Sequence, residues 1–196
     1  IISLLSLNLY AESTLEKIQK SGRFVVCSES GQIPYEMRKN NGDWYGFDIE
    51  MMQSFSKSLH VALVMKDTNW DGIIPALISG KCDAIASSMV VTEERKSMVD
   101  FSDVIVNDGV LALSRINDHE IIIKNDNLSD FDLPGIRISV PQGTVSDFIT
   151  QKSIKHATLL KYQTNADAFA AFVTRKTDIV VSDKSYIIMM NLMNQN

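Results

Sequence analysis

Short apolar runs alternate with amphipathic stretches along the first half of the chain. Nearly continuous apolar runs, typical of strands that are buried on both faces, occupy residues 23–28, 61–65 and 83–87. Helical spacing or a terminal glycine marks the expected helices at residues 12–21, 49–59 and 73–79. Pro75 should lie near the start of the third helix, where a missing N–H costs least. This alternation predicts a parallel α/β sheet.

The second half of the chain repeats the alternation. A largely apolar stretch, residues 104–114, is the expected crossing strand. Further strands are expected at residues 136–140, 158–162 and 178–181, with helices at residues 145–151 and 165–176 and a Met-rich helix that ends near residue 193. A second α/β unit is therefore predicted.

Two segments echo each other in the two halves. LISGKCDAIASS, from Leu77, and FVTRKTDIVVSD, from Phe172, each combine a helix end, Lys-X-Asp, a buried strand and a polar tip. The echo favours two related lobes. Because ligands of open α/β sheets bind outside the carboxyl ends of the strands, polar strand tips should face one cleft. These tips are Glu29, Ser88, Gly143 and Asp183.

Composition and charge exclude several classes of protein. The chain has 196 residues, 45% of them hydrophobic, and a net charge of −5, whereas nucleic-acid binding usually leaves a basic footprint. No apolar run approaches the roughly 20 residues of a membrane-spanning helix. Residues 1–11 are apolar and uncharged and are interpreted as the remnant of a secretory signal, the alternative being a buried N-terminal element.

The two cysteines are interpreted as buried thiols. Cys27 lies late in one expected strand and Cys82 lies just before another. If these strands are parallel neighbours, an offset of four or five residues at ~3.3 Å each exceeds the ~7 Å Cα separation that a disulfide allows. The three histidines lack metal-ligand spacing. We therefore expect no metal site and no cofactor.

The stretch from residue 87 to residue 103 carries the clearest candidate chemistry. A buried strand ends in Ser87-Ser88, a short charged helix is expected to begin near Thr92, and Arg95 lies at its start. A guanidinium that faces the end of a parallel strand suits a carboxylate, which it can bind through two parallel hydrogen bonds. We expect this stretch to bind the head group of a small amino-acid-like ligand.

Several motifs together resemble a known family. They are PYE…GFDIEM (34–51), NWDGIIPAL (69–77), GKCDAIASSMVVTEERKSMVDFSD (80–103), VPQGT (140–144) and KTDIVVSD (176–183). In this order they are similar to the periplasmic solute-binding proteins of amino-acid ABC importers, family 3, the two-lobed "Venus flytrap" proteins. The resemblance implies an α/β fold of two lobes, each a mostly parallel sheet flanked by helices.

The resemblance also implies how the head group is held. Arg95, which closes the TxER-like motif, would bind the ligand carboxylate, and Thr144 with the amide of Val145 would bind it from the second lobe. Asp183 would pair with the α-ammonium, or would cap the following helix, or both. Carbonyl or hydroxyl groups around Ser87 and Ser88 would assist Asp183.

The side-chain end of the expected site departs from the family. Trp70 matches the family's aromatic wall, and Glu29 matches a position that often contacts the ligand's distal group, although a solvated place at the cleft rim is the alternative. Gln32 stands where an aromatic lid is usual, and Val90 where Ser or Thr is usual, so that only the backbone N–H of Val90 can serve. These residues favour a polar or basic amino acid.

The resemblance predicts a periplasmic, monomeric protein without catalytic activity. One amino acid would be captured between a first lobe of residues 12–108 and a second lobe of residues 109–196, and the closed form would contact a membrane permease. In the family the chain returns to the first lobe, and that return segment is expected to be missing here.

Two other functions are compatible with the same scaffold. One is a cyclohexadienyl or prephenate-type dehydratase, for which Glu29 and Asp183 are the candidate general acids. The other is the ligand-sensing domain of a larger receptor.

Overall fold

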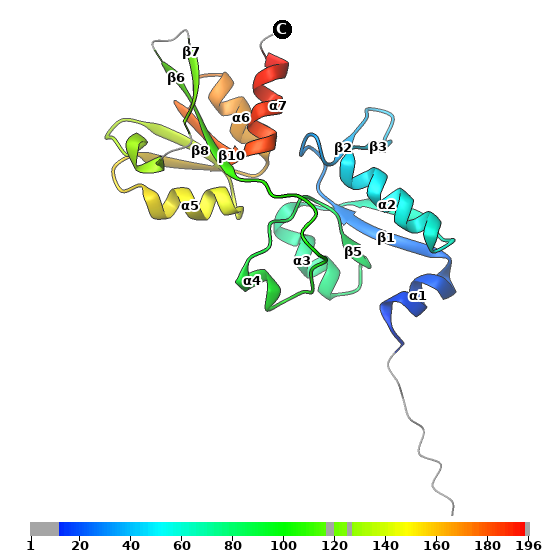
Figure 1. Cartoon of the computed structure of the whole chain (residues 1–196). Coiled ribbons are helices and arrows are strands. Elements are labelled where there is room, and N and C mark those ends of the chain that lie inside the picture. The colour runs from blue at the N-terminus through cyan, green and yellow to red at the C-terminus, as the bar shows by residue number, and fades with distance from the viewer. Residues whose placement is uncertain (1–11, 117–119, 125–126, 195–196) are drawn as a thin grey trace, which may run out of the picture.

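The computed structural model describes residues 12–116, 120–124 and 127–194. Within them the chain forms two lobes, each a β-sheet with helices on its faces (Figure 1). This confirms the predicted two-lobed α/β fold. The division at residues 108 and 109 stays a prediction, and residues 1–11, the expected signal remnant, lie outside the described part.

The first lobe is built on a parallel three-stranded sheet. Its strands are β1 (Arg23–Ser28), β4 (Ala62–Asp67) and β5 (Ala84–Ile85), with a hairpin of β2 (Met37–Arg38) and β3 (Trp44–Tyr45) beside it. Its helices are α1 (Thr14–Ser21), α2 (Phe47–Ser58), α3 (Trp70–Ile78) and α4 (Glu93–Lys96). The strand order is β4-β1-β5. Alternate side chains of β1 pack against α1 and α2 on one face and against α3 on the other.

The second lobe is built on a mixed five-stranded sheet. Its strands are β6 (Val110–Ile116), β7 (Glu120–Lys124), β8 (Arg137–Pro141), β9 (Thr158–Tyr162) and β10 (Ile179–Asp183). Its helices are α5 (Val145–Ser153), α6 (Asn165–Val173), α7 (Lys184–Asn194) and the 3-10 turn η1 (Leu128–Phe131). The order is β7-β6-β10-β8-β9, with β10, β8 and β9 parallel and β6 antiparallel to both neighbours.

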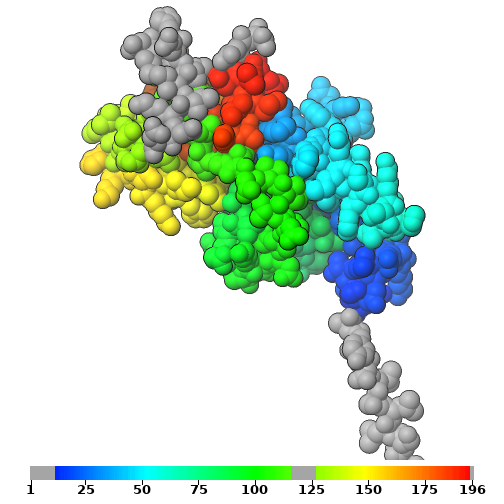
Figure 2. Space-filling model, viewed as in Figure 1, coloured from blue at the N-terminus to red at the C-terminus, as the bar shows by residue number. Residues whose placement is uncertain are grey.

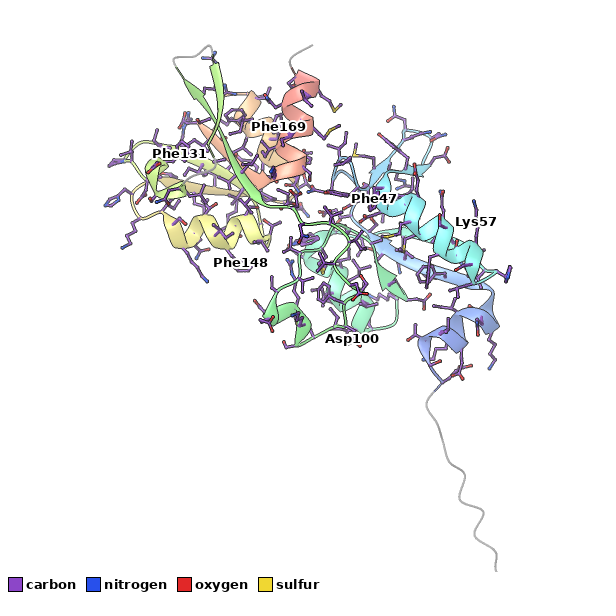
Figure 3. All side chains as sticks on the ribbon, viewed as in Figure 1. Phe47, Lys57, Asp100, Phe131, Phe148 and Phe169 are labelled. Atoms are coloured by element: carbon purple, nitrogen blue, oxygen red, sulfur yellow. A yellow bond between two sulfur atoms is a disulfide. The ribbon has the colours of Figure 1, made fainter. Side chains whose placement is uncertain are left out.

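The second sheet is also covered on both faces. Helices α6 and α7 cover one face and α5 with η1 covers the other. Figure 3 shows Phe169 inside this packing, 3% exposed, whereas Phe148 projects from α5 and is 49% exposed.

The hairpin strand β7 was not predicted from the sequence. The segment before β6, residues 101–109, joins the lobes, and Figure 2 shows it with α4 (green) on the face in view.

The two Lys-X-Asp segments form the same corner in both lobes. The Asp83 amide donates to the Val25 carbonyl at 2.7 Å, and the Asp83 carboxylate accepts from the Val25 amide at 2.8 Å. Asp178 makes the same pair of bonds with Arg137, both at 2.8 Å. Each corner joins the strand that follows a helix to its parallel neighbour, β5 to β1 in the first lobe and β10 to β8 in the second. The sequence echo therefore corresponds to a repeated structural unit.

The interpretation of the cysteines as free thiols is wrong. Cys27 and Cys82 form a disulfide with a Cα–Cα separation of 5.7 Å. The expected offset assumed an extended chain before β5, but Gly80 is left-handed (φ 71°) and β5 begins only at Ala84. The chain therefore turns at residues 80–83 and brings Cys82 beside Cys27. In the second lobe the corresponding positions, Ser139 and Thr177, are joined by a hydroxyl hydrogen bond of 3.0 Å.

The start of α3 also differs from the expectation. The helix expected at residues 73–79 starts earlier, because residues 69–72 are its N-cap and first turn. The Trp70 amide donates to the Glu29 carboxylate at 2.8 Å, which fixes the helix start there. Pro75 is consequently inside the helix rather than near its start. None of the described helices is long and apolar enough to cross a membrane.

The disulfide predicts a large loss of stability on its removal. It closes a sequence separation of 55 residues, for which loop-closure entropy corresponds to about 4 kcal/mol. We expect the C27A/C82A variant to unfold in urea with a correspondingly lower free energy. The natural sequence, reduced and alkylated, is the matched control and should behave like the variant. Alkylation of two thiols in denatured but unreduced protein would contradict the assignment.

Candidate functional site

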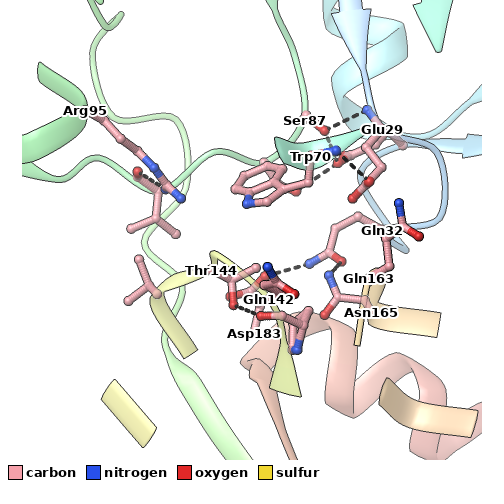
Figure 4. Close-up of a pocket in the computed structure, with 15 residues that line it drawn as sticks. Glu29, Gln32, Trp70, Ser87, Arg95, Gln142, Thr144, Gln163, Asn165 and Asp183 are labelled. Carbon is pink, nitrogen blue, oxygen red and sulfur yellow. Dashed lines mark hydrogen bonds between the residues drawn. The ribbon is translucent and has the colours of Figure 1, made fainter. Parts of the chain in front are cut away.

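A pocket lies at the carboxyl ends of the strands, between the two lobes (Figure 4). It contains about 450 Å³ of empty space, part of it open to solvent. All ten residues expected to bind the ligand line it: Glu29, Gln32, Trp70, Ser87, Ser88, Val90, Arg95, Thr144, Val145 and Asp183. Their roles toward a ligand stay predictions.

Five further lining residues were missed. They are Glu36, Pro141, Gln142, Gln163 and Asn165. Glu36 belongs to the PYE motif and Gln142 to VPQGT, so both were within segments that already pointed to the site. Gln163 follows β9 directly, and the rule that placed the other strand tips in the cleft applies to it as well.

Arg95 is held by backbone carbonyls and an aromatic ring. Thr92 caps α4 by accepting from the Arg95 amide at 3.2 Å, which fixes where the side chain leaves the helix. The guanidinium donates to the carbonyls of Val90 at 2.8 Å and Gly143 at 3.3 Å, and lies 5.1 Å from the centre of the Trp70 ring. Burial lowers the pKa of Arg95, yet arginine stays charged at neutral pH. Among the described residues, carbonyls take two of its five donors.

The start of α5 faces Arg95 from the second lobe. The Thr144 hydroxyl caps this helix by accepting from the Asp147 amide at 3.3 Å, and it donates to the Pro141 carbonyl at 2.7 Å. Val145 is the first helical residue. Its amide has no acceptor within the helix, and the helix dipole makes this end favourable for an anion.

Glu29 and Trp70 position each other. Besides accepting from the Trp70 amide, Glu29 donates its own amide to the Ser87 hydroxyl at 3.0 Å. The Trp70 indole donates across the cleft to the Gly143 carbonyl at 3.2 Å. Burial raises the pKa of Glu29. The carboxylate is therefore half-buried inside the pocket rather than solvated at its rim.

Asp183 accepts a hydrogen bond from the opposite lobe. The Gln32 amide donates to its Oδ2 at 2.7 Å. Burial raises the pKa of Asp183 to about 6. At the start of α7, Asp108 accepts from the Ser185 amide at 3.3 Å and from its hydroxyl at 2.5 Å. Asp183 precedes α7 directly, and its role as a helix cap stays a prediction.

Glu36 is a buried acceptor for the hydroxyls of the two serines at the strand tip. Its Oε1 accepts from the Ser87 hydroxyl at 3.1 Å and the Ser88 hydroxyl at 3.0 Å, and the residue is 1% exposed. Burial, with the nearby Asp48 carboxylate, raises the pKa of Glu36 to about 10. Glu36 is therefore neutral at pH 7. Ser88 is held in a left-handed conformation (φ 40°) by donating its amide to Asp48 at 3.0 Å.

Comparison with known proteins identifies the family. The model of the bacterial extracellular solute-binding proteins, family 3, matches residues 24–186. The chain belongs to this family. This confirms the resemblance that the motifs carried.

The relatives of this chain are named for different roles. A probable histidine-binding protein of Campylobacter jejuni is 36% identical over 74% of this chain and 54% of the relative. A cyclohexadienyl dehydratase of Pseudomonas aeruginosa is 26% identical over 88% of this chain and 63% of the relative. The chain thus spans less than two thirds of either relative. The arginine-bound, truncated ArgBP of T. maritima is a structural neighbour with a TM-score of 0.83 and 28% identity, covering 92% of this chain and 82% of that one.

A neutral Glu36 predicts an unusual pH dependence of stability. The folded protein keeps Glu36 protonated up to about pH 10, whereas the unfolded chain loses this proton near its ordinary pKa of 4.5. Its stabilising contribution is therefore complete below about pH 4.5 and is lost as the pH rises toward 10. Glu36→Gln retains an acceptor for both serines and carries no proton to lose. We expect this variant to exceed the natural sequence in unfolding free energy by at least about 1.4 kcal/mol at pH 9.

Urea unfolding at pH 5, 7 and 9 measures this difference. The control is Glu36→Ala, which leaves two hydroxyls without their acceptor and should cost roughly 2 kcal/mol at pH 5. An equal pH dependence for the natural sequence and Glu36→Gln would show that Glu36 is ionised in the fold.

Proposed function

We propose that this chain captures a cationic amino acid between its lobes as the binding protein of an ABC importer. The observation that carries the substrate class is the charge inside the pocket. At neutral pH the lining residues supply one cation, Arg95, and two carboxylates, Glu29 and Asp183, while Glu36 is neutral. The pocket therefore has a net charge of −1, which complements an amino acid with a positive side chain.

The head group would lie between Arg95 and Asp183. The ligand carboxylate would accept from the free donors of Arg95 and from the amide of Val145 at the start of α5. The α-ammonium would donate to Oδ1 of Asp183, because Oδ2 already accepts from Gln32. Val90 would contribute no side-chain hydrogen bond, because its side chain is apolar. Its backbone carbonyl already accepts from Arg95.

The ligand side chain would extend along Trp70 toward Glu29. A guanidinium or ammonium there would meet a half-buried carboxylate, and the pairing would recover the free energy lost by burying Glu29. The amides of Gln142 and Gln163 also line this space and offer neutral acceptors. The arginine-bound ArgBP neighbour agrees with a ligand of this charge.

The setting of this activity follows from the family and the disulfide. The family consists of bacterial extracellular proteins, and disulfides persist in oxidising compartments such as the periplasm. We propose that the protein acts there as a monomer and that the closed lobes, residues 12–108 and 109–196, are recognised by the permease.

A dehydratase is the second candidate. It is favoured by the Pseudomonas aeruginosa relative and by the raised pKa of Asp183 and Glu29, which suits a general acid. Incubation with prephenate and arogenate distinguishes the two functions. We expect no product, and turnover that is lost in Glu29→Gln or in Asp183→Asn would establish the enzyme.

Removal of Arg95 should remove amino-acid binding. Arg95→Ala deletes the only cation among the described residues that line the pocket, and with it a charge-assisted hydrogen-bond pair. Isothermal titration calorimetry with L-arginine and L-lysine should show at least a 100-fold loss of affinity, about 2.7 kcal/mol. Arg23→Ala, at an exposed position, is the control and should bind as before. Retained affinity in Arg95→Ala would mean that the carboxylate binds elsewhere.

Glu29→Gln should change the preference among ligands. The amide oxygen can still accept from the Trp70 N–H, so that the start of α3 is preserved while the charge is removed. L-arginine and L-citrulline have the same shape and differ in side-chain charge. We expect the preference for arginine over citrulline to fall about tenfold or more, ~1.4 kcal/mol.

The control for this change is Glu50→Gln, at an exposed position of α2. It should leave the preference unchanged. If Glu29→Gln discriminates as well as the natural sequence, Glu29 does not contact the side-chain cation.

A further inference from the structure

Gln32 connects the two lobes through both ends of its side-chain amide. Its Nε2 donates to Asp183 Oδ2 at 2.7 Å, and its Oε1 accepts from the Asn165 amide at 2.6 Å (Figure 4). Asn165 in turn accepts from the Ser182 hydroxyl. One first-lobe side chain is thus tied to the end of β10 and the start of α6 in the second lobe.

The first lobe holds Gln32 in a fixed place. Its backbone N–H donates to the backbone carbonyl of Glu36 at 3.0 Å, and its backbone carbonyl accepts from the backbone N–H of Tyr35 at 2.8 Å. The residue is 7% exposed. Because the backbone of Gln32 is already fixed, only side-chain freedom is lost when the amide bonds across the cleft, so that more of each bond contributes to holding the lobes together.

The two Gln32 bonds are shorter than the side-chain bonds that Trp70 and Arg95 make across the cleft. The donors of Trp70 and Arg95 both reach the Gly143 carbonyl, at 3.2 and 3.3 Å. These distances are at or beyond the long end of the usual range for N–H···O bonds, whereas 2.6 and 2.7 Å are at its short end. All of these bonds join protein atoms to protein atoms.

We propose that Gln32 is a positioning residue that draws the lobes together and orients the Asp183 carboxylate before an amino acid binds. The ligand contacts then have to supply less of the free energy of closure, because the binding-competent form is already populated. The effect on affinity rests on the proposed function. The closure itself does not, since it depends only on contacts between the lobes.

A charge at position 32 should break this connection in a pH-dependent way. The groups that act on Asp183 from the surrounding segments are Arg95, Asp108, Glu36 and Tyr35. Gln32→Glu keeps the size and the acceptor for Asn165 but places a carboxylate against Asp183. At pH 8 the two charges repel and the lobes separate. At pH 5 one of the two carboxyls is protonated and donates to the other, so that the lobes close again.

Trp70 provides a direct readout, because its indole reaches the second lobe. The chain has two tryptophans, so Trp44→Phe leaves Trp70 as the reporter. Fluorescence emission of Trp70 and small-angle X-ray scattering are measured without any amino acid. The samples are the Trp44→Phe parent and the same protein with Gln32→Ala or Gln32→Glu. Gln53→Ala, which removes an exposed glutamine of α2, is the matched control. Thermal melts confirm that each variant is folded.

The expected result is a red-shifted Trp70 emission and a larger radius of gyration in Gln32→Ala at both pH values. Gln32→Glu should show the same shift at pH 8 and return toward the parent at pH 5, while Gln53→Ala stays unchanged. Affinity for L-arginine should fall about tenfold in Gln32→Ala. Parent-like emission and radius in both folded Gln32 variants would overturn the proposal, even if arginine binds. Failure to bind any amino acid would instead remove the proposed function and leave the closure result standing.

Discussion

Burial of carboxyl groups in one cleft is the constraint on which the site depends. Glu29, Glu36 and Asp183 line the same pocket as the guanidinium of Arg95, and their pKa values are all raised by desolvation. The fold meets this cost differently at each position. Glu36 stays neutral and serves as an acceptor for two serines, Glu29 accepts from a helix start, and Asp183 accepts from a neutral amide. The remaining negative charge is what a cationic ligand would neutralise.

The repeated corner explains why these groups meet. In each lobe a Lys-X-Asp segment follows a helix, and the aspartate joins the next strand to its parallel neighbour, β5 to β1 and β10 to β8. Both sheets therefore present their carboxyl ends to the cleft, and polar strand tips from segments far apart in sequence become neighbours. This much follows from the sequence, because the apolar runs and the two matching segments are local patterns. Of the ten expected lining residues, Glu29, Ser88 and Asp183 followed from strand tips, whereas others, such as Gln32, Trp70 and Thr144, came from the resemblance to the family.

Contacts that depend on departures from regular geometry could not be predicted from the sequence. The disulfide was missed because the chain at Gly80 turns where a straight strand was assumed. The early start of α3 depends on a carboxylate 41 residues away in sequence, at Glu29. The neutral state of Glu36 depends on burial beside Asp48, which a motif such as PYE does not reveal. Sequence patterns thus place residues at the cleft, whereas their protonation and partners are set by packing.

Gln32 shows how recognition and closure can share one residue. Where the family usually has an aromatic lid, this chain has an amide that donates to one Asp183 oxygen and leaves the other for an ammonium. A phenylalanine ring would contact a ligand after closure, but it offers no hydrogen bond to the second lobe. The amide makes that bond with protein atoms alone, while Trp70 and Arg95 share the Gly143 carbonyl nearby. The substitution therefore shifts part of the free energy of closure from the ligand to the protein, and the head-group site is assembled by the same contact.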